Sequence, residues 1–380
     1  MWKRWAMLTV LLLFLLGGQV RADVQSEEEP SKLEVGAKAA ILMDAASGRV
    51  LFEQNADTRY PMASTTKIMT ALIAVEHCRM DEIVTAGKNA SGVEGTSIYL
   101  SEGERLTMYQ MLQGLMLRSG NDAAVAIAEH IAGDVKQFAS LMNARAEMLG
   151  ADANFVTPNG LDAQGHGASA RAMALIAREA MKQPVFRELV STQEAVIPWV
   201  DNEYNRVLRN KNRLLTDYEG ATGIKTGFTS KAGRCLVFSA QRDGMELIGV
   251  VMSCPNWFDE AERMLDWGFS NFSVRQVVRA GEIIAEANVS NGMQEDVRLY
   301  AEDDLAYPIA PSDEWNLTVY SAEVLEAPVS AGDKAGYLIL TVNGEECGRV
   351  DALVREDVPK WSVMSAVRRW FSSMAFFGGN

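Results

Sequence analysis

Histidine is scarce in this sequence, and its cysteines follow no recognisable pattern. It contains three histidines, His77, His130 and His166, and four cysteines that lie far apart at irregular intervals. A Ser-His-Asp triad or a histidine-rich metal site has little material to draw on, and the cysteines form neither a zinc pattern nor a redox Cys-x-x-Cys pair. We therefore expect no metal and no cofactor, with the cysteines buried as small apolar residues. Any nucleophile in this chain would need a base other than histidine.

Basic residues are also in short supply. Lysine and arginine number 36 against 50 aspartates and glutamates, which gives a formal net charge of −14. A protein that binds DNA or RNA neutralises phosphates with clustered basic side chains, so this balance excludes nucleic acid as a partner. It also predicts that any contact with a membrane is confined to a small part of the chain.

The apolar run near the N-terminus, Met7 to Leu16, is shorter than the roughly 20 residues that a membrane-spanning helix needs. It follows two basic residues and precedes Val20-Arg21-Ala22, which has the small-x-small form of a signal-peptidase site. We expect a signal peptide over residues 1–22 and an acidic leader over residues 23–33, with an uncleaved anchor helix as the alternative. The protein would then be secreted across the cytoplasmic membrane.

Residues 34–273 combine short strands with long helical patterns. Hairpins are expected over residues 39–53 and over residues 235–252, where Asp243-Gly244 supplies the turn. Apolar residues recurring every three or four positions predict helices over residues 64–78, 106–117, 123–131, 135–149, 170–182 and 259–269. Strands at both ends of the unit, with helices between them, indicate an α/β sandwich whose antiparallel sheet joins distant segments.

Residues 274–357 have a different sequence pattern, in which short runs typical of β-strands replace the helical periodicity. Short β-like runs occur at residues 316–319, 337–342 and 349–354, and Asn343-Gly344 is a further hairpin turn. We expect a small all-β domain here.

The segment 358–380 is amphipathic. Aromatic residues such as Trp361 and Trp370 recur at helical spacing, and Arg368 and Arg369 occupy other positions between them. Aromatic residues on one side and cations on the other are typical of a helix that lies in a membrane interface. We expect a membrane anchor on the outer face of the cytoplasmic membrane, with a helix docked on its own protein as the alternative.

One serine and one lysine stand out at the start of the helical pattern over residues 64–78. Ser64 and Lys67 are three residues apart, so on a helix they project from the same face, and the amine can reach the hydroxyl. If burial and a nearby cation lower the pKa of the lysine, it can act as a general base without histidine. The alternative for Ser64 is an N-cap, a role that serine often fills.

The chain contains a single Ser-x-x-Lys, and two further motifs follow it in order. These are Ser119-Gly120-Asn121 and Lys225-Thr226-Gly227, each of which occurs once. Alone, the second would be an ordinary interhelical turn and the third an exposed strand end. The ordered triple matches the set that characterises penicillin-binding proteins and class A β-lactamases, with Gly120 where the usual Ser-Asp-Asn has its aspartate.

With these motifs the sequence resembles the low-molecular-mass penicillin-binding proteins of the D-alanyl-D-alanine carboxypeptidase (type 5) family. The similarity extends over residues 61–67, 119–123, 157–161 and 225–229. It implies an α/β (α+β) penicillin-binding and serine β-lactamase-like transpeptidase fold with an antiparallel sheet and a helical subdomain. A small C-terminal all-β domain and an amphipathic tail helix would follow. The implied catalytic domain is residues 34–273.

The resemblance also implies roles for the residues of the first two motifs. Ser64 would be the nucleophile and Lys67 its base. Ser119 would relay a proton to the leaving D-alanine, and Asn121 would hold the substrate amide.

The third motif would complete the substrate site. Lys225 would add positive potential that helps to keep the base neutral, and Thr226 would bind the terminal carboxylate beside Gly227. The backbone N–H groups of Phe228 and Ser64 would form the oxyanion hole.

Two positions depart from the family pattern. Ala172 stands where relatives usually carry an acidic residue, so some local contact is lost. Relatives also place an arginine between two asparagines shortly before the Lys-Thr-Gly strand. Here Asn210-Lys211-Asn212 puts a lysine in place of the planar guanidinium near the substrate carboxylate.

The expected function is removal of the terminal D-alanine from peptidoglycan stem pentapeptides, with β-lactam antibiotics as covalent inhibitors. A serine β-lactamase is the nearest alternative enzyme. Class A members deacylate with a glutamate in a Glu-x-x-Leu-Asn loop, and this sequence has no such pentapeptide. A non-catalytic wall-binding scaffold of the same fold is a further alternative, although each side chain that the chemistry needs is present.

Overall fold

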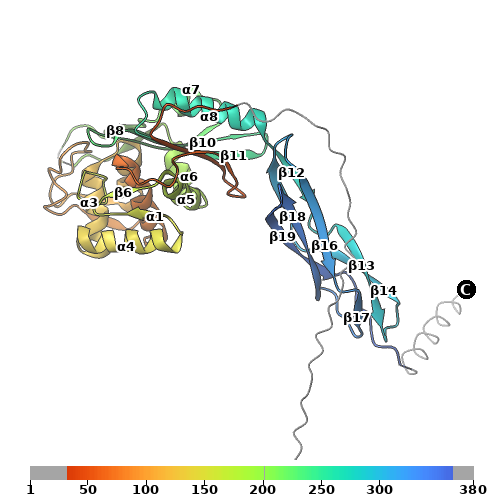
Figure 1. Ribbon diagram of the computed structural model, residues 1–380. Coiled ribbons are helices and arrows are strands. Elements are labelled where there is room, and N and C mark those ends of the chain that lie inside the picture. Colours follow the sequence, from red (N-terminus) through yellow and green to blue (C-terminus); the bar gives the residue numbers. More distant parts are fainter. Residues whose placement is uncertain (1–31, 201, 363–380) are drawn as a thin grey trace, which may run out of the picture. The chain divides into compact units, whose positions relative to one another are not determined.

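The computed structural model describes residues 32–200 and 202–362, which fall into two compact units divided between Ser273 and Val274 (Figure 1). The predicted signal peptide and most of the predicted acidic leader lie outside the described residues. Within the described ranges, no helix has the length and apolar character needed to cross a membrane.

The first unit is built on a five-stranded sheet in the order β2-β1-β11-β10-β9. Its strands are β1 (Ala39–Asp44), β2 (Val50–Gln54), β9 (Ala221–Thr229), β10 (Gly233–Arg242) and β11 (Met245–Met252). All neighbouring pairs are antiparallel, and β1 pairs with β11 in a register that places Ile41 opposite Val250. The predicted antiparallel sheet built from distant segments is therefore confirmed.

Helices cover both faces of this sheet, as Figure 1 shows. They are α1 (Lys67–His77), α2 (Met108–Leu117), α3 (Asn121–Ala132), α4 (Val135–Met148), α5 (Ala170–Met181), α6 (Pro184–Ser191), α7 (Leu214–Asp217) and α8 (Trp257–Asn271). Helix α8 packs on β10 and β11 from one side, while α5 and α6 contact β11 and β9 from the other. The result is the expected sandwich with a helical subdomain.

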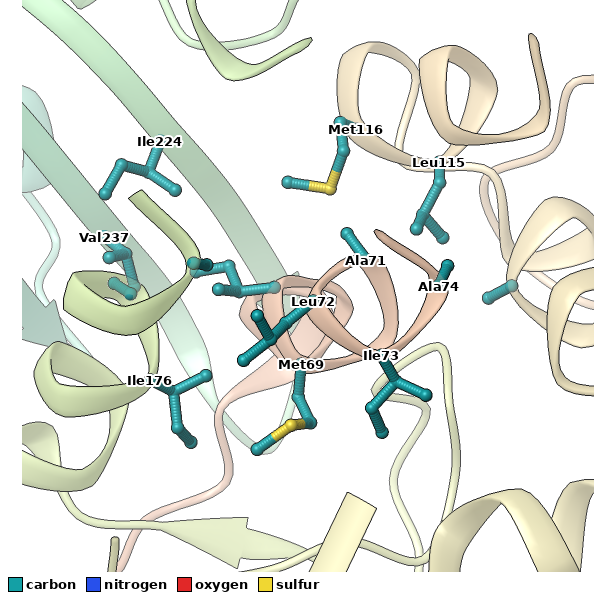
Figure 2. Close-up of a cluster of buried hydrophobic side chains, with 14 of the residues drawn as sticks. Met69, Ala71, Leu72, Ile73, Ala74, Leu115, Met116, Ile176, Ile224 and Val237 are labelled. Atoms are coloured by element: carbon teal, nitrogen blue, oxygen red, sulfur yellow. The ribbon is translucent and has the colours of Figure 1, made fainter. Parts of the chain in front are cut away.

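Helix α1 lies at the centre of the core and contacts α2, α3, α4, α5 and α6. Its residues from Lys67 to Ala74 are all buried. In Figure 2, side chains from α2, α5 and the sheet surround it, among them Leu115, Ile176 and Val237. A helix buried on all sides can carry polar groups only where those groups find partners, which makes Lys67 the residue to explain.

Short elements connect the main ones. A 3-10 turn η1 (Ala63–Thr66) leads directly into α1, and three two-stranded ribbons lie among the helices. The ribbons are β3 (Ile83–Thr85) with β4 (Arg105–Thr107), β5 (Ala153–Asn154) with β6 (Gly167–Ala168), and β7 (Glu194–Ile197) with β8 (Arg206–Arg209).

The described part of the second unit consists of strands. Its six-stranded sheet has the order β16-β18-β19-β14-β13-β17, and β12 pairs with β15. The strands are β12 (Ser273–Val278), β13 (Ile283–Ser290), β14 (Asp296–Ala301), β15 (Leu305–Ile309), β16 (Trp315–Ser321), β17 (Val324–Glu326), β18 (Lys334–Val342) and β19 (Glu345–Val354). Asn343 and Gly344 both have positive φ between β18 and β19, as the predicted Asn-Gly turn requires. The small all-β domain is thus confirmed.

The start of the predicted anchor helix differs from expectation. Val358 is fully buried and bridges to Val329, and Lys360 bridges to Gly292. Residues 358–362 are therefore not helical, and Val358 fills a position in the apolar core of the β unit while residues 359–362 are exposed. The rest of the predicted anchor lies outside the described residues.

Candidate active site

The turn η1 and the first residue of α1 bring Ser64 and Lys67 together. The amine Nζ of Lys67 and the hydroxyl Oγ of Ser64 are 2.9 Å apart, in hydrogen-bond contact. The N-cap positions of η1 and α1 are Met62 and Thr66, so Ser64 is not the N-cap residue of either element. The cap alternative for Ser64 is therefore excluded.

Two carbonyl oxygens complete the surroundings of the Lys67 amine. Its Nζ donates to the side-chain Oδ1 of Asn121 at 2.7 Å and to the backbone oxygen of Asn159 at 2.5 Å. The pKa of Lys67 is held well below its usual value, first by burial, then by the positive charges of Lys225 and Lys211. The carboxylate of Asp122 acts in the opposite direction.

Asn121 begins α3 and is fixed from two sides. Its side-chain Nδ2 donates to the backbone oxygen of Glu94 at 2.6 Å, and its backbone N–H donates to the oxygen of Thr96 at 2.7 Å. The neighbouring Asp122 is fully buried and accepts the Ser97 hydroxyl and backbone N–H groups of the same loop. These bonds hold the Oδ1 of Asn121 toward Lys67.

Ser119 precedes α3 in a left-handed conformation with φ of 62°. Its backbone oxygen accepts the hydroxyl of Thr96 at 2.7 Å, and the residue is 4% exposed. Within the described residues its own hydroxyl makes no hydrogen bond, which leaves it available to a ligand.

Strand β9 supplies the third motif at the edge of the sheet. Lys225, Thr226 and Gly227 are buried, whereas the side chain of Phe228 is 63% exposed. A Cβ on Gly227 would stand only 2.9 Å from the backbone nitrogen of Ser64. Glycine therefore allows β9 to lie directly against η1, and all three motifs meet in one place.

Lys225 is the second buried amine of the site. Its Nζ donates to the backbone oxygen of Thr226 at 2.9 Å. Burial, followed by the positive charge of Lys211, lowers the pKa of Lys225 to about 7. Lys211 is exposed, and its charge lowers the pKa of both buried amines, so it adds positive potential to the site.

The turn around Asn159 contributes a group that the motifs did not predict. Its backbone oxygen contacts Lys67, and Gly160 follows with φ of +84°. A Cβ on Gly160 would overlap the backbone oxygen of Ala63 in η1. The stretch Thr157 to Leu161 belongs to the family resemblance, so the sequence carried a signal here without indicating that a backbone oxygen was the contact.

His166 links the segment at Val156 to Thr66 at the end of η1. Its Nδ1 accepts the backbone N–H of Val156 at 3.0 Å, and its Nε2 lies 3.0 Å from the hydroxyl of Thr66. Burial lowers the pKa of His166 to about 4, so the ring is neutral at pH 7 and Nε2 carries the hydrogen. His166 thus holds η1 in place through its hydrogen bond with Thr66 and does not serve as a base.

The comparison with protein families agrees with this arrangement. Residues 23–256 match the model of the family described as D-alanyl-D-alanine carboxypeptidase. Residues 272–360 match the model described as the C-terminal domain of penicillin-binding protein 5.

Individual relatives are similar over most of their length. The chain is 31% identical to D-alanyl-D-alanine carboxypeptidase DacF of Bacillus subtilis, covering 91% of this chain and 92% of that one. It is 33% identical to the DacC carboxypeptidase of Escherichia coli over 95% of both chains. The crystal structure of penicillin-binding protein 5 from Haemophilus influenzae superposes with a TM-score of 0.74 at 31% identity, covering 87% of this chain and 99% of that one. With the three motifs gathered around Lys67, these matches show that the chain belongs to the serine-type D-alanyl-D-alanine carboxypeptidase family.

Proposed function

We propose that this protein removes the terminal D-alanine from peptidoglycan stem pentapeptides through an acyl-enzyme on Ser64. The Oγ of Ser64 attacks the carbonyl carbon of the penultimate D-alanine, and the amide bond to the terminal D-alanine breaks. Water then hydrolyses the ester and regenerates the serine. β-Lactam antibiotics would acylate the same hydroxyl, because their strained amide presents an equivalent carbonyl.

The arrangement around Lys67 is the observation that carries this proposal. A neutral amine has two hydrogens and one lone pair. The oxygens of Asn121 and Asn159 accept the two hydrogens, so the lone pair is directed at the hydroxyl of Ser64, 2.9 Å away. Burial and neighbouring cations favour that neutral form. Lys67 is therefore positioned to take the proton of Ser64 during attack.

The remaining motif residues can bind the substrate on either side of the bond that breaks and protonate its leaving group. The hydroxyl of Ser119 can pass a proton to the departing amine, and Asn121 can bind the substrate amide. The terminal carboxylate would lie against Thr226, with Lys225 and Lys211 supplying positive potential.

The developing oxyanion needs N–H donors where η1 meets β9. We assign these to the backbone of Ser64 and Phe228, which lie on the two elements that Gly227 allows to touch. The exposed ring of Phe228 takes no part in that role.

The test compares substrate and inhibitor on the same preparation. A pentapeptide ending in D-Ala-D-Ala is incubated with the enzyme and its mass followed, while fluorescent penicillin reports acylation. We expect loss of one D-alanine and a long-lived penicilloyl adduct, both abolished in Ser64→Ala and both kept in the control Ser290→Ala, which alters an exposed serine of the second unit.

The alternatives give different results. Rapid multiple turnover of penicillin without release of D-alanine would make the protein a β-lactamase. Neither labelling nor release would make it a wall-binding scaffold.

We also propose that residues 1–22 direct secretion across the cytoplasmic membrane and that residues 23–33 form a solvated leader. The aromatic and cationic pattern beyond residue 362 would attach the enzyme to the outer face of that membrane. Attachment would keep the active site near its polymeric substrate.

A further inference from the structure

Three side chains of metal-binding type gather away from the active site. They are Cys78, Glu82 and His130, and the Sγ, carboxylate oxygen and imidazole nitrogen that they offer all lie within 4.8 Å of one another. The Nε2 of His130 and the Oε1 of Glu82 are 2.9 Å apart. Cys78 and His130 are half-buried and Glu82 is exposed, so an ion can enter from solvent.

The cluster lies where two helices end. Cys78 is the C-cap residue of α1, and His130 belongs to the last turn of α3. The partial negative charge at a helix C-terminus favours a cation, and here two such ends meet in one place. The nearby Arg79 is paired with both carboxylate oxygens of Asp81, so its charge is already compensated.

The donor set is suited to one class of ion. A thiolate, an imidazole and a carboxylate are the ligands of zinc, which takes sulfur at about 2.3 Å and nitrogen at about 2.0–2.1 Å. Tetrahedral ligands at those distances stand about 3.3–3.8 Å apart, within the spread that the cluster already has. Three protein ligands leave the fourth position to water.

We propose that Cys78, Glu82 and His130 bind a zinc ion. On binding, the Cys78 thiol releases its proton to solvent, and the hydrogen bond between His130 and Glu82 opens as both turn to the metal. The ion would link the C-terminal ends of α1 and α3. The opposite ends of these helices carry Lys67 and Asn121, so the ion acts on stability and not on the chemistry.

The spacing of these residues hides the site in the sequence. Cys78 and Glu82 are near each other along the chain, but His130 is far downstream, and no short ligand motif results. Packing of α3 against α1 brings the third ligand in.

Cobalt and zinc titrations of the full chain test the proposal. Cobalt bound through a thiolate gives a sulfur-to-metal charge-transfer absorption in the near ultraviolet. We expect this band at one equivalent, displaced by zinc, together with a higher Tm in zinc. Cys78→Ser should abolish the band and weaken zinc binding at least about tenfold, and His130→Ala should weaken binding by a similar factor.

Matched variants separate this site from adventitious binding. His77→Ala changes the exposed histidine next to Cys78, and Cys347→Ser changes a half-buried cysteine of the second unit. Both should keep the band and the affinity, and circular dichroism checks the fold of each variant. Absence of the band in the unaltered chain would overturn the proposal, as would unchanged zinc affinity in a folded His130→Ala protein.

Discussion

Two buried amines share the active site, and the positive charge of Lys225 lowers the pKa of Lys67. Lys67 has three oxygen partners and Lys225 has one, the backbone oxygen of Thr226. Burial is the largest cause of the lowered pKa of both. Lys67 can then act as a base, while Lys225, with a pKa of about 7, is partly charged at neutral pH.

Replacing Lys67, the proposed base, should slow acylation of Ser64. We expect Lys67→Ala to slow labelling of Ser64 by fluorescent penicillin by about 10²–10⁴-fold, because general-base assistance is worth that much. Rapid-quench labelling measures the rate, and the exposed Lys88→Ala is the control. A folded Lys67→Ala protein that acylates at the original rate would remove the lysine from this role.

The lowered pKa of Lys225 predicts that activity falls as the pH rises above neutrality. Its pKa of about 7 means that raising the pH through neutrality removes the charge that would attract the substrate carboxylate. Loss of that charge should lower kcat/KM above about pH 7, mainly through a higher KM. In Lys225→Arg the charge persists, and we expect the alkaline fall to disappear even if the maximum is lower.

The corresponding measurement is kcat/KM for D-alanine release across the pH range, with Lys88→Arg as the matched variant. If Lys225→Arg keeps the fall near pH 7, another group titrates there.

At the scale of elements, the site depends on how closely two segments approach η1. Strand β9 needs Gly227 to reach it, and the turn at Gly160 lies against it from another side. Neither contact leaves room for a side chain. The 3-10 turn that carries Ser64 is therefore shaped by its neighbours as much as by its own residues.

Gly160→Ala tests this dependence. A Cβ here meets the oxygen of Ala63 and requires an alanine at φ of +84°. Gly244 has a nearly equal φ of +82°, with nothing within 4 Å of an added Cβ, so Gly244→Ala carries the backbone strain alone. We expect that strain to cost roughly 1–3 kcal/mol, and Gly160→Ala to cost more and to slow acylation.

Denaturant unfolding and penicillin labelling of the two variants supply the comparison. Equal stability and equal labelling of the two variants would mean that η1 shifts to accommodate the added Cβ without loss of stability or acylation.

At the scale of the whole molecule, the second unit retains part of the segment assigned to attachment. Val358 belongs to its core, and Lys360 bridges to Gly292. Contacts of the folded β unit therefore continue past residue 357, into the segment predicted to form the anchor.

Two truncations distinguish the roles of this segment. A chain ending at Ser362 should keep both folded units and its activity while losing sedimentation with anionic liposomes. A chain ending at Glu356 also loses Val358, and we expect its second unit to unfold at a lower temperature because a buried side chain is removed. Equal liposome binding by the full chain and the 362 form would instead support a docked helix.

Local pattern sufficed for much of the protein. The expected ranges for α1, α3, α4 and α5 agree with the structure to within a few residues, because helical periodicity and caps are properties of neighbouring positions. Small elements such as α6, β7 and β8 escaped prediction, since they are short and their stability comes from packing. The ordered motifs likewise named Ser64, Lys67, Ser119 and Lys225 because each lies in a short distinctive string.

Local sequence pattern was enough to place the long helices, to assign the family and to name the side chains proposed for the chemistry. Only the tertiary structure decided that β1 pairs with β11, that the backbone oxygen of Asn159 takes a hydrogen of Lys67, and that His130 reaches Cys78. Each of these joins residues far apart along the chain, and periodicity and spacing carry no information about which distant segments meet. The lowered pKa of Lys67 has the same origin, because burial exists only once the whole domain has closed around the helix.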